Sequence, residues 1–314
     1  MSKINSLYNN PILTCTVVSD THIDINHPVP ALPMKLLRNA IDDSTSAVNG
    51  TDAFIIIGDT TSRGNDRNWE LVNEVFKKTK RKPECLLMAI GNHDIWSDEG
   101  AEAAIGRYLK NYTLLDGKEH SKTYFSKVIK GCYFIFLGSE GDADCEAEIS
   151  DDQLEWFSSK MKDAGESGKP IFVFCHQSLN GKHGLPKTFS RDESDTGPMD
   201  GGIGTKSAEI EQILKKYSNV YYFSGHSHMG ISSFESIETK GYSDFEKDGN
   251  LTLINLPSLA CGNHHGEFNK TGCGLQLEVY DDKVVLRPRR YNRKKWLKSV
   301  KIKDGKPYYE ETIK

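Results

Sequence analysis

Two histidines of this sequence lie where a metal ion could bind. In the stretch FSGHSHMG, His226 and His228 follow the aromatic run 220–223 and are separated by a single serine. Side chains two residues apart just beyond a strand can converge on one point, and imidazole is the commonest metal ligand in proteins. This stretch alone fits a metal site and an ordinary loop equally well, so the other apolar runs must decide.

Four more apolar runs end in the same kinds of residue. The candidate ligands, in chain order, are Asp20, His22, Asp59, Asn92, His176, His226 and His228. One polar residue after a strand is usually a turn former, but five such ends are hard to explain as turns. Clustered histidine, aspartate and asparagine indicate metal ligation, so we predict a metal site.

The donor types and their number indicate which metals bind. Oxygen and imidazole donors without thiolate favour manganese, iron, zinc or nickel over copper(I) or an iron–sulfur cluster. Seven candidates are too many for one tetrahedral ion and fit two ions that share a carboxylate. Such pairs, with ions about 3.5–4 Å apart, promote in-line displacement at phosphorus. We therefore expect two divalent or trivalent ions, with Mn, Fe or Zn preferred.

The elements that position these residues alternate along the chain. Strand-like apolar runs are expected at 13–19, 53–58, 85–91, 133–138, 171–175 and 220–224, and amphipathic helical patterns separate most of them. This alternation predicts an α/β fold with largely parallel, buried strands. Each candidate ligand then lies at the carboxyl end of a strand, where open α/β sheets bind their ligands. After residue 230 the pattern predicts antiparallel strands to about residue 290.

Composition limits the class of protein. The 314 residues carry a net charge of −4, which argues against a dedicated nucleic-acid binder. The seven cysteines form no CxxC pair, which fits the reducing cytoplasm. No signal peptide or apolar run long enough for a membrane span is recognised. We expect one domain, residues 1–314, in the cytoplasm, and the oligomeric state stays open.

The polar residues at the strand ends occur in a familiar order. The blocks are Asp20-x-His22, Gly58-Asp59, Gly91-Asn92-His93-Asp94, His176 and Gly225-His226-Ser227-His228. This series resembles the calcineurin-like metallophosphoesterase superfamily, and the match runs from residue 20 to 228. The resemblance implies an α/β four-layer sandwich, in which two mixed β-sheets lie face to face with helices outside.

The resemblance also implies roles for single residues. It makes Asp20, His22 and His228 ligands of the first ion, Asn92, His176 and His226 ligands of the second, and Asp59 the bridge. His93 is then the proton donor or phosphate contact, and the catalytic residues are His93, Asp59 and Asn92. The reaction implied is hydrolysis of a small phosphodiester or phosphomonoester, such as a cyclic nucleotide or nucleotide, by a metal-bridging hydroxide.

One departure concerns the partner of His93. In the protein phosphatase branch an aspartate orients this histidine, but Ser62 stands at that position. This argues against that branch and leaves Asp94 or Asp66 as possible substitutes. Arg63 is a candidate phosphate contact because its guanidinium suits phosphate oxygens, and a plain loop residue is the equal alternative.

Three further segments are open to interpretation. Residues 180–206 form a long glycine-rich stretch that we interpret as a substrate-facing lid. His264 and His265 are interpreted as a solvated loop pair rather than as a third metal site. The basic tail 287–314 favours one alternative function, a nuclease that acts on DNA or RNA. A non-enzymatic scaffold on the same fold is the other alternative, and it predicts broken metal motifs, which are not found.

Overall fold

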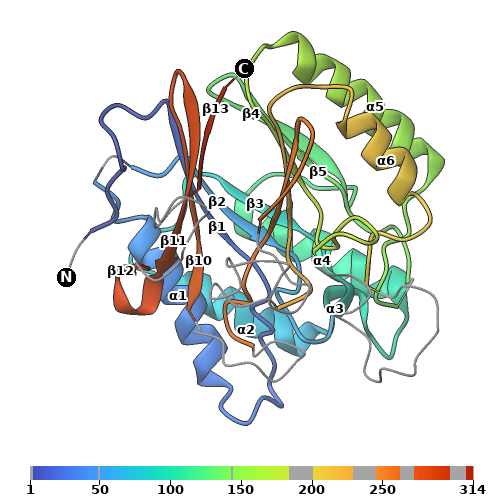
Figure 1. Cartoon of the computed structure of the whole chain (residues 1–314). Helices are drawn as coiled ribbons and strands as arrows, with labels where there is room; N and C mark the ends of the chain where they lie inside the picture. The colour runs from blue at the N-terminus through green and yellow to red at the C-terminus, as the bar shows by residue number, and fades with distance from the viewer. Residues whose placement is uncertain are drawn as a thin grey trace, which may run out of the picture.

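Two β-sheets lie face to face with helices on their outer sides (Figure 1). In this computed structural model the described residues are 3–48, 50–142, 144–183, 201–228, 245–261, 272–297 and 309–313. The predicted four-layer α/β sandwich of two mixed sheets is therefore confirmed.

The first sheet combines a parallel half with an antiparallel half. Its strands, in spatial order, are β12 (Lys295–Trp296), β11 (Lys283–Arg290), β10 (Cys273–Val279), β1 (Leu13–Val18), β2 (Ala53–Ile57) and β3 (Leu86–Ala89), and β13 (Tyr309–Thr312) also pairs with β11. β1, β2 and β3 are parallel, whereas β10 pairs antiparallel with both β1 and β11. The carboxyl ends of β1, β2 and β3 thus share one edge.

The second sheet repeats this mixed arrangement. Its order is β4 (Phe125–Ile129), β5 (Cys132–Phe136), β6 (Ile171–Phe174), β7 (Val220–Ser224), β9 (Leu251–Asn255) and β8 (Phe245–Asp248). β5, β6, β7 and β9 are parallel neighbours. The antiparallel pairing expected after residue 230 is confirmed between β9 and β8, but it is wrong for β9 and β7, which pair in parallel. The first part of the stretch predicted to form antiparallel strands, at 231–239, lies outside the described residues.

Helices cover both outer faces. α1 (Ala31–Ser44), α2 (Asp66–Lys78) and α4 (Ala101–Asp116) pack on the first sheet, and α5 (Asp151–Glu166) and α6 (Ser207–Leu214) pack on the second. The short helix α3 (Asn92–Ile95) and the 3-10 turn η2 (Tyr291–Arg293) complete the described elements. Among these, no helix has both the length and the apolar character needed to cross a membrane.

The central strands are apolar along their whole length because both of their faces are buried. In β2, Ala53, Ile55 and Ile57 contribute to the core between the sheets. Phe54 and Ile56 point the other way and pack against the helices of the first sheet. Strands covered on both faces lose the usual alternation of apolar and polar residues, which is why the sequence shows continuous apolar runs.

The start of the basic tail belongs to the folded core. Arg287 and Arg289 lie in β11 and are 8% and 0% exposed. Arg287 Nη1 donates to Glu278 Oε1 at 2.8 Å, and Arg289 Nε donates to Asp43 Oδ2 at 2.6 Å. Both guanidinium groups also lie over the ring of Trp296, at 3.6 and 4.6 Å. These two charges therefore stabilise the fold and are not part of a free basic surface.

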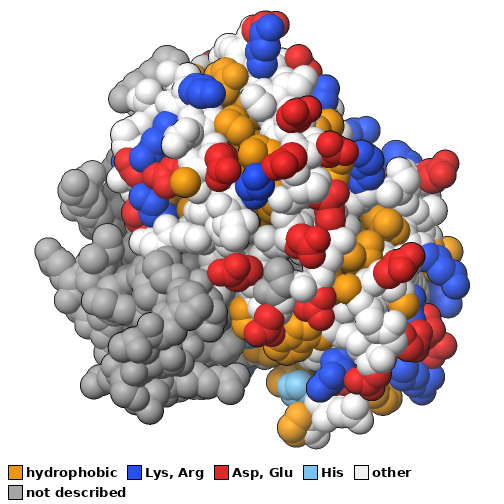
Figure 2. All heavy atoms as spheres, turned by 90° about the vertical axis from the view of Figure 1, so that its right-hand side faces the viewer, with side chains coloured by type: hydrophobic (Ala, Val, Ile, Leu, Met, Phe, Trp, Pro, Cys, Tyr) orange, Lys and Arg blue, Asp and Glu red, His pale blue; other side chains and the backbone are white. Residues whose placement is uncertain are grey.

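The outer surface that carries α5 and α6 mixes charges of both signs. In Figure 2 acidic and basic side chains are interspersed on the upper part of this face. Ion pairs account for part of the mixture: Lys160 pairs with Asp163 at 2.9 Å, and Lys206 pairs with Asp151 at 2.6 Å. This pattern is typical of a solvated surface rather than of a polyanion-binding patch.

The buried pair of Asp43 and Arg289 leads to a prediction about stability. Asp43→Ala leaves a buried guanidinium without its carboxylate and is expected to lower the free energy of unfolding by about 3–5 kcal/mol. Urea unfolding followed by circular dichroism measures this change. Glu74→Ala is the control, because Glu74 pairs with Lys78 on the exposed surface of α2 and its loss is expected to change the stability far less. Equal losses in the two variants would contradict the prediction.

Candidate metal centre

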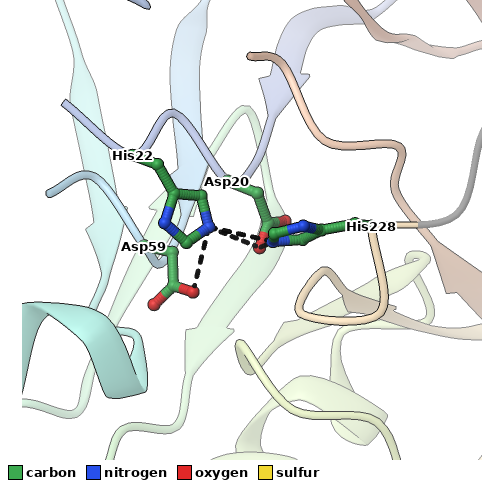
Figure 3. Close-up of side chains that lie close together, drawn as sticks. All are labelled: Asp20, His22, Asp59 and His228. Carbon is green, nitrogen blue, oxygen red and sulfur yellow. Dashed lines mark hydrogen bonds and ion pairs between the residues drawn. The ribbon is translucent and has the colours of Figure 1, made fainter. Parts of the chain in front are cut away.

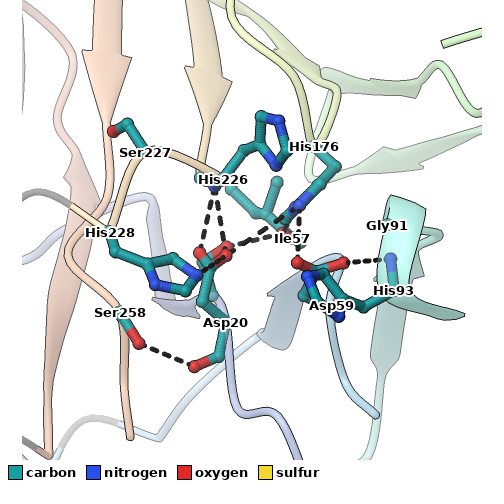
Figure 4. Close-up of polar contacts among 12 residues, drawn as sticks. Asp20, Ile57, Asp59, Gly91, His93, His176, His226, Ser227, His228 and Ser258 are labelled. Carbon is teal, nitrogen blue, oxygen red and sulfur yellow. Dashed lines mark hydrogen bonds and ion pairs between the residues drawn. The ribbon is translucent and has the colours of Figure 1, made fainter. Parts of the chain in front are cut away.

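The centre forms where strand ends from both sheets meet (Figure 4). The first sheet supplies Asp20 and His22 after β1, Asp59 after β2, and Asn92 after β3; the second supplies His176 after β6, and His226 and His228 after β7. All seven predicted ligand residues are at most 6% exposed. Six of them form two potential metal-binding groups. The distance between the two sheets therefore sets the size of the centre.

The first group contains Asp20, His22, Asp59 and His228 (Figure 3). His22 Nε2 lies 2.9 Å from His228 Nε2 and 3.4 Å from Asp59 Oδ2. His228 Nε2 lies 3.1 Å from Asp20 Oδ1. Two imidazole nitrogens and two carboxylates thus point at one small space, as ligands of a single cation do.

The second group contains Asp59, His176 and His226. His176 Nε2 lies 3.1 Å from Asp59 Oδ2, the same oxygen that faces His22. His176 Nδ1 lies 2.8 Å from the carbonyl oxygen of Ile57, which can only accept a hydrogen bond. The ring hydrogen of neutral His176 is therefore on Nδ1, and Nε2 presents its lone pair to the centre. Asp59 belongs to both groups, as a bridging ligand must.

Asn92 provides a test of whether a cation fits. Its side chain is 2% exposed, and neither its amide oxygen nor its amide nitrogen has a hydrogen-bond partner. Asp59 Oδ2 and His176 Nε2 are likewise buried without a hydrogen bond. Unsatisfied buried polar groups cost about 1–3 kcal/mol each, and ligation of a cation removes such a cost. The donor set present therefore fits a pair of metal ions.

Five ligand residues have strained backbone conformations. The φ angles are 54° for Asp20, 47° for His22, 47° for Asp59, 66° for His226 and 51° for His228. Positive φ is uncommon for residues other than glycine, and such strain gathers at functional sites. Sharp turns directly after the strands allow residues close in sequence to direct their side chains into one space.

Two glycines of the motifs leave room for the ligands. A Cβ atom on Gly58 would lie 2.4 Å from Nδ1 of His176, and Gly58 also has a φ of +72°. A Cβ atom on Gly225 would lie 2.5 Å from Oδ2 of Asp20. Gly58 and Gly225, which precede Asp59 and His226, therefore allow close approach between the strand ends.

Electrostatics keep most of the ligands in their metal-binding forms. Burial alone would raise the pKa of Asp20, but His228 and His22 hold it well below its usual range. Burial lowers the pKa of both His22 and His226, so their rings are neutral at pH 7. In His176 the charge of Asp59 outweighs burial and raises the pKa to about 9.

Residues that the sequence analysis did not select hold the ligand loops. Ser258 Oγ donates to the carbonyl oxygen of Asp20 at 2.9 Å. Asn255 Nδ2 donates to the carbonyl oxygen of Gly225 at 2.8 Å, and Asn255 Oδ1 accepts from Ser227 Oγ at 2.5 Å. These residues lie in and just after β9. Asn255 reaches the centre because β9 pairs with β7, and Ser258 because it forms a bridge with Ser19 after β1.

His93 lies beside Asp59 and is oriented by the main chain. Its backbone N–H donates to Asp59 Oδ1 at 2.9 Å, and its Nδ1 lies 3.0 Å from the carbonyl oxygen of Ser62. The Ser62 hydroxyl instead donates to the carbonyl oxygen of His22. The position that holds aspartate in protein phosphatases thus contributes a backbone carbonyl here.

The proposed substitutes for that aspartate have other places. The Asp94 carboxylate accepts backbone hydrogen bonds from Thr60, Thr61 and Gly91. Burial, together with nearby Asp59, raises its pKa to about 6. Asp66 is exposed at the start of α2. Arg63 is exposed as well, and its contact with substrate stays a prediction.

The predicted lid and the histidine pair lie largely outside the described residues. Of the segment 180–206, residues 184–200 are not described. At its start, Lys182 pairs with Asp248 at 2.9 Å, and Asn180 Nδ2 donates to Gly204 O at 3.0 Å. His264 and His265 are also outside the described residues, so both interpretations stay predictions.

Comparison with known proteins agrees with this geometry. The model of the family "calcineurin-like phosphoesterase" matches residues 13–230, which is most of the chain. The reaction class of that family is hydrolysis of phosphoester bonds, the class predicted from the sequence.

Two individual proteins resemble the chain. Glycerophosphodiester phosphodiesterase GpdQ from Enterobacter lignolyticus (strain SCF1) is 26% identical over 164 residues, which are 51% of this chain and 54% of that protein. The chain thus matches only about half the length of this relative. The crystal structure of a dimetal phosphatase from Danio rerio has a TM-score of 0.62 at 13% identity and covers 97% of this chain and 100% of that one. At this identity the second likeness shows the fold alone.

The shared position of Asp59 leads to a prediction about metal content. Asp59→Asn is expected to reduce the occupancy of both ions, whereas His228→Ala is expected to reduce that of one. Elemental analysis of the purified proteins measures the ratio of metal to chain. Asp24→Asn is the control, because Asp24 lies two residues beyond His22 but in neither ligand group. A wild-type protein that holds no transition metal and keeps its activity in chelator would contradict the prediction.

Proposed function

Since the chain belongs to the calcineurin-like phosphoesterase family, we propose that it is a metal-dependent hydrolase of small phosphodiesters. The observation that carries the proposal is the pair of buried ligand groups that share Asp59, with His93 beside them. The proposed ligands are Asp20, His22 and His228 for the first ion, Asn92, His176 and His226 for the second, and Asp59 for both. When bound, two such ions activate a water molecule as the nucleophile and offset charge on the phosphoryl oxygens.

The chain itself keeps the centre suited to an anion. Asn92 is an amide at a position where a third carboxylate would reduce the positive charge of the loaded site. Asp20 and Asp59 are then the only carboxylates of the two ligand groups. A phosphoester is an anion, so a centre with excess positive charge favours its binding and its more highly charged transition state.

His93 is proposed as the proton donor. The Ser62 carbonyl can only accept a hydrogen bond, so the hydrogen on Nδ1 of His93 points to Ser62. In the imidazolium form the second hydrogen is on Nε2. As the bond between phosphorus and the leaving oxygen breaks, this proton moves to that oxygen and neutralises it. His93 then returns to its neutral form, with the lone pair on Nε2.

The likeness to GpdQ supports a diester rather than a monoester. That relative is named a glycerophosphodiester phosphodiesterase, and the aligned part covers 51% of this chain. Cyclic nucleotides are diesters and stay within the proposed class, whereas other nucleotides are monoesters and are the less favoured substrates. Mn, Fe or Zn as the two ions and a lid role for residues 180–206 also stay proposals.

The two alternative functions are less well supported. A nuclease that binds through its tail needs free cations, but Arg287 and Arg289 are buried and paired with acidic residues. A scaffold without activity does not need a complete ligand set, yet six of the seven predicted ligands lie in two adjoining groups and Asn92, the seventh, follows β3.

A substrate panel tests the proposed function. With Mn²⁺ added, the protein is expected to hydrolyse bis(p-nitrophenyl) phosphate and small glycerol or nucleoside diesters faster than the matching monoesters. The rate of product formation gives kcat/KM for each substrate, and these values rank the substrates. Asp59→Asn is the inactive control. Faster hydrolysis of monoesters across the panel would overturn the diester assignment, and hydrolysis restricted to DNA or RNA would favour the nuclease.

The role of His93 is tested by comparing leaving groups. A ribose-type alkoxide needs a proton as it leaves, whereas p-nitrophenolate leaves without one. His93→Ala is therefore expected to slow the ribose-type ester by about 10²–10⁴-fold and the p-nitrophenyl counterpart far less. The measurement is kcat/KM for both substrates, with metal content determined on the same samples. Similar losses for both would make His93 an electrostatic contact and not a proton donor.

A further inference from the structure

A buried arginine on α4 lies behind the loop that orients His93. Arg107 is 9% exposed and is not among the ligand groups. Its Nε donates to the carbonyl oxygen of Gly64 at 2.7 Å, and its Nη2 donates to Ser97 Oγ at 2.7 Å. Its Nη1 donates to Glu99 Oε2 at 2.6 Å. One guanidinium thus joins two loops, 62–64 and 96–99, that follow different strands.

The two loops are packed too closely to move independently. The Gly64 N–H donates to the carbonyl oxygen of Trp96 at 2.8 Å. A Cβ atom on Gly64 would lie only 1.9 Å from the carbonyl oxygen of Asp94. Upstream, Asp94 accepts from the backbone of Thr60 and Thr61. The loop is therefore fixed before Ser62 by Asp94 and after it by Arg107.

Both loops contact the His93 ring. Ser62 provides the carbonyl oxygen for Nδ1 at 3.0 Å. The Trp96 ring lies against the imidazole with a centroid distance of 4.2 Å, and the His22 ring lies on it edge to face at 4.6 Å. Ser62 is two residues from Gly64, and Trp96 is next to Ser97. Each loop that Arg107 holds thus carries one of the contacts that fix the imidazole.

We propose that Arg107 is a positioning residue for His93, acting through the Ser62 carbonyl and the Trp96 ring. The inference rests on the proposed function, because it assigns Arg107 to the proton-transfer step and not to metal binding. The rigid fork of the guanidinium suits this role, since it sends donors to Gly64 and Ser97 in fixed directions. Glu99 is 65% exposed, so the pair with Glu99 is the least important of the three contacts.

The test uses Arg107→Met, which keeps the aliphatic part of the side chain and removes its donors. Displacement of His93 is expected to lower kcat for the ribose-type ester by about 10- to 100-fold, because an error of about 1 Å can cost 10²-fold. The p-nitrophenyl counterpart, which does not need the proton, is expected to lose about threefold or less. Metal content is expected to equal that of the wild type. In the double variant that combines His93→Ala with Arg107→Met, the loss of Arg107 is expected to add no further difference between the rates for the two substrates.

Two control variants separate positioning from general destabilisation. Arg287→Met removes a similarly buried arginine, 8% exposed, whose hydrogen-bond partners are Glu278 and the backbone of Asn5. It is expected to lower stability without changing the ratio of rates for the two substrates. Glu99→Gln keeps the hydrogen bonds to Gly64 and Ser97 and is expected to leave that ratio unchanged. Arg107→Lys keeps the charge but not the forked guanidinium, and it is expected to give an intermediate ratio of rates. It serves as the test variant if Arg107→Met fails to fold.

A second measurement does not depend on turnover. In the metal-free protein, long-range nitrogen–proton NMR spectra of the His93 ring report which nitrogen carries the hydrogen. The wild type is expected to show the Nδ1–H form, and Arg107→Met or Arg107→Lys a mixture of the Nδ1–H and Nε2–H forms. The same tautomer in wild type and variant, or equal losses for both substrates, would overturn the inference. If His93→Ala itself slows both substrates equally, the proton-donor role fails and the inference falls with it; if only the Arg107 variants do so, the inference alone fails.

Discussion

The two ligand groups depend on the position of one carboxylate, that of Asp59. Its Oδ2 lies 3.4 Å from His22 Nε2 and 3.1 Å from His176 Nε2, while its Oδ1 accepts the backbone N–H of His93 at 2.9 Å. One oxygen thus faces both groups and the other is fixed by the main chain, so the carboxylate has little freedom to rotate. The two candidate metal sites, the strained turn after β2 and the position of His93 are therefore all linked through this carboxylate.

Because the ligands come from both sheets, packing between the sheets sets the geometry of the centre. Strands β1 and β2 face β6 and β7 through a core that includes Val17, Ile57, Phe174 and Phe223. Protein interiors are close-packed and deform little, so this core holds the strand ends at a fixed separation. Buried like charges and positive φ angles each cost free energy, and a rigid core is what allows them to persist.

Most of the fold could be predicted from the sequence, and so could the meeting of six of the seven predicted ligands in two groups. Each predicted ligand lies within a few residues of the end of an apolar run, so local pattern was enough to place it at a sheet edge. The half-buried edge strands β4 and β8 lack such runs and were missed. The parallel pairing of β9 with β7 fixes the role of Asn255, and the bridge between Ser258 and Ser19 fixes that of Ser258. No local pattern in the sequence could show these.

The group that orients His93 could not be predicted from the sequence either. The sequence places serine where a carboxylate orients this histidine in protein phosphatases, and the side chains nearby suggested Asp94 or Asp66 instead. The structure uses the Ser62 backbone carbonyl, which every residue type possesses and which sequence comparison therefore cannot reveal. A carbonyl oxygen, like a carboxylate, can only accept a hydrogen bond, so it selects the tautomer of His93 with its hydrogen on Nδ1. The other ring nitrogen, Nε2, is then the one left for the proposed transfer of a proton to the leaving group.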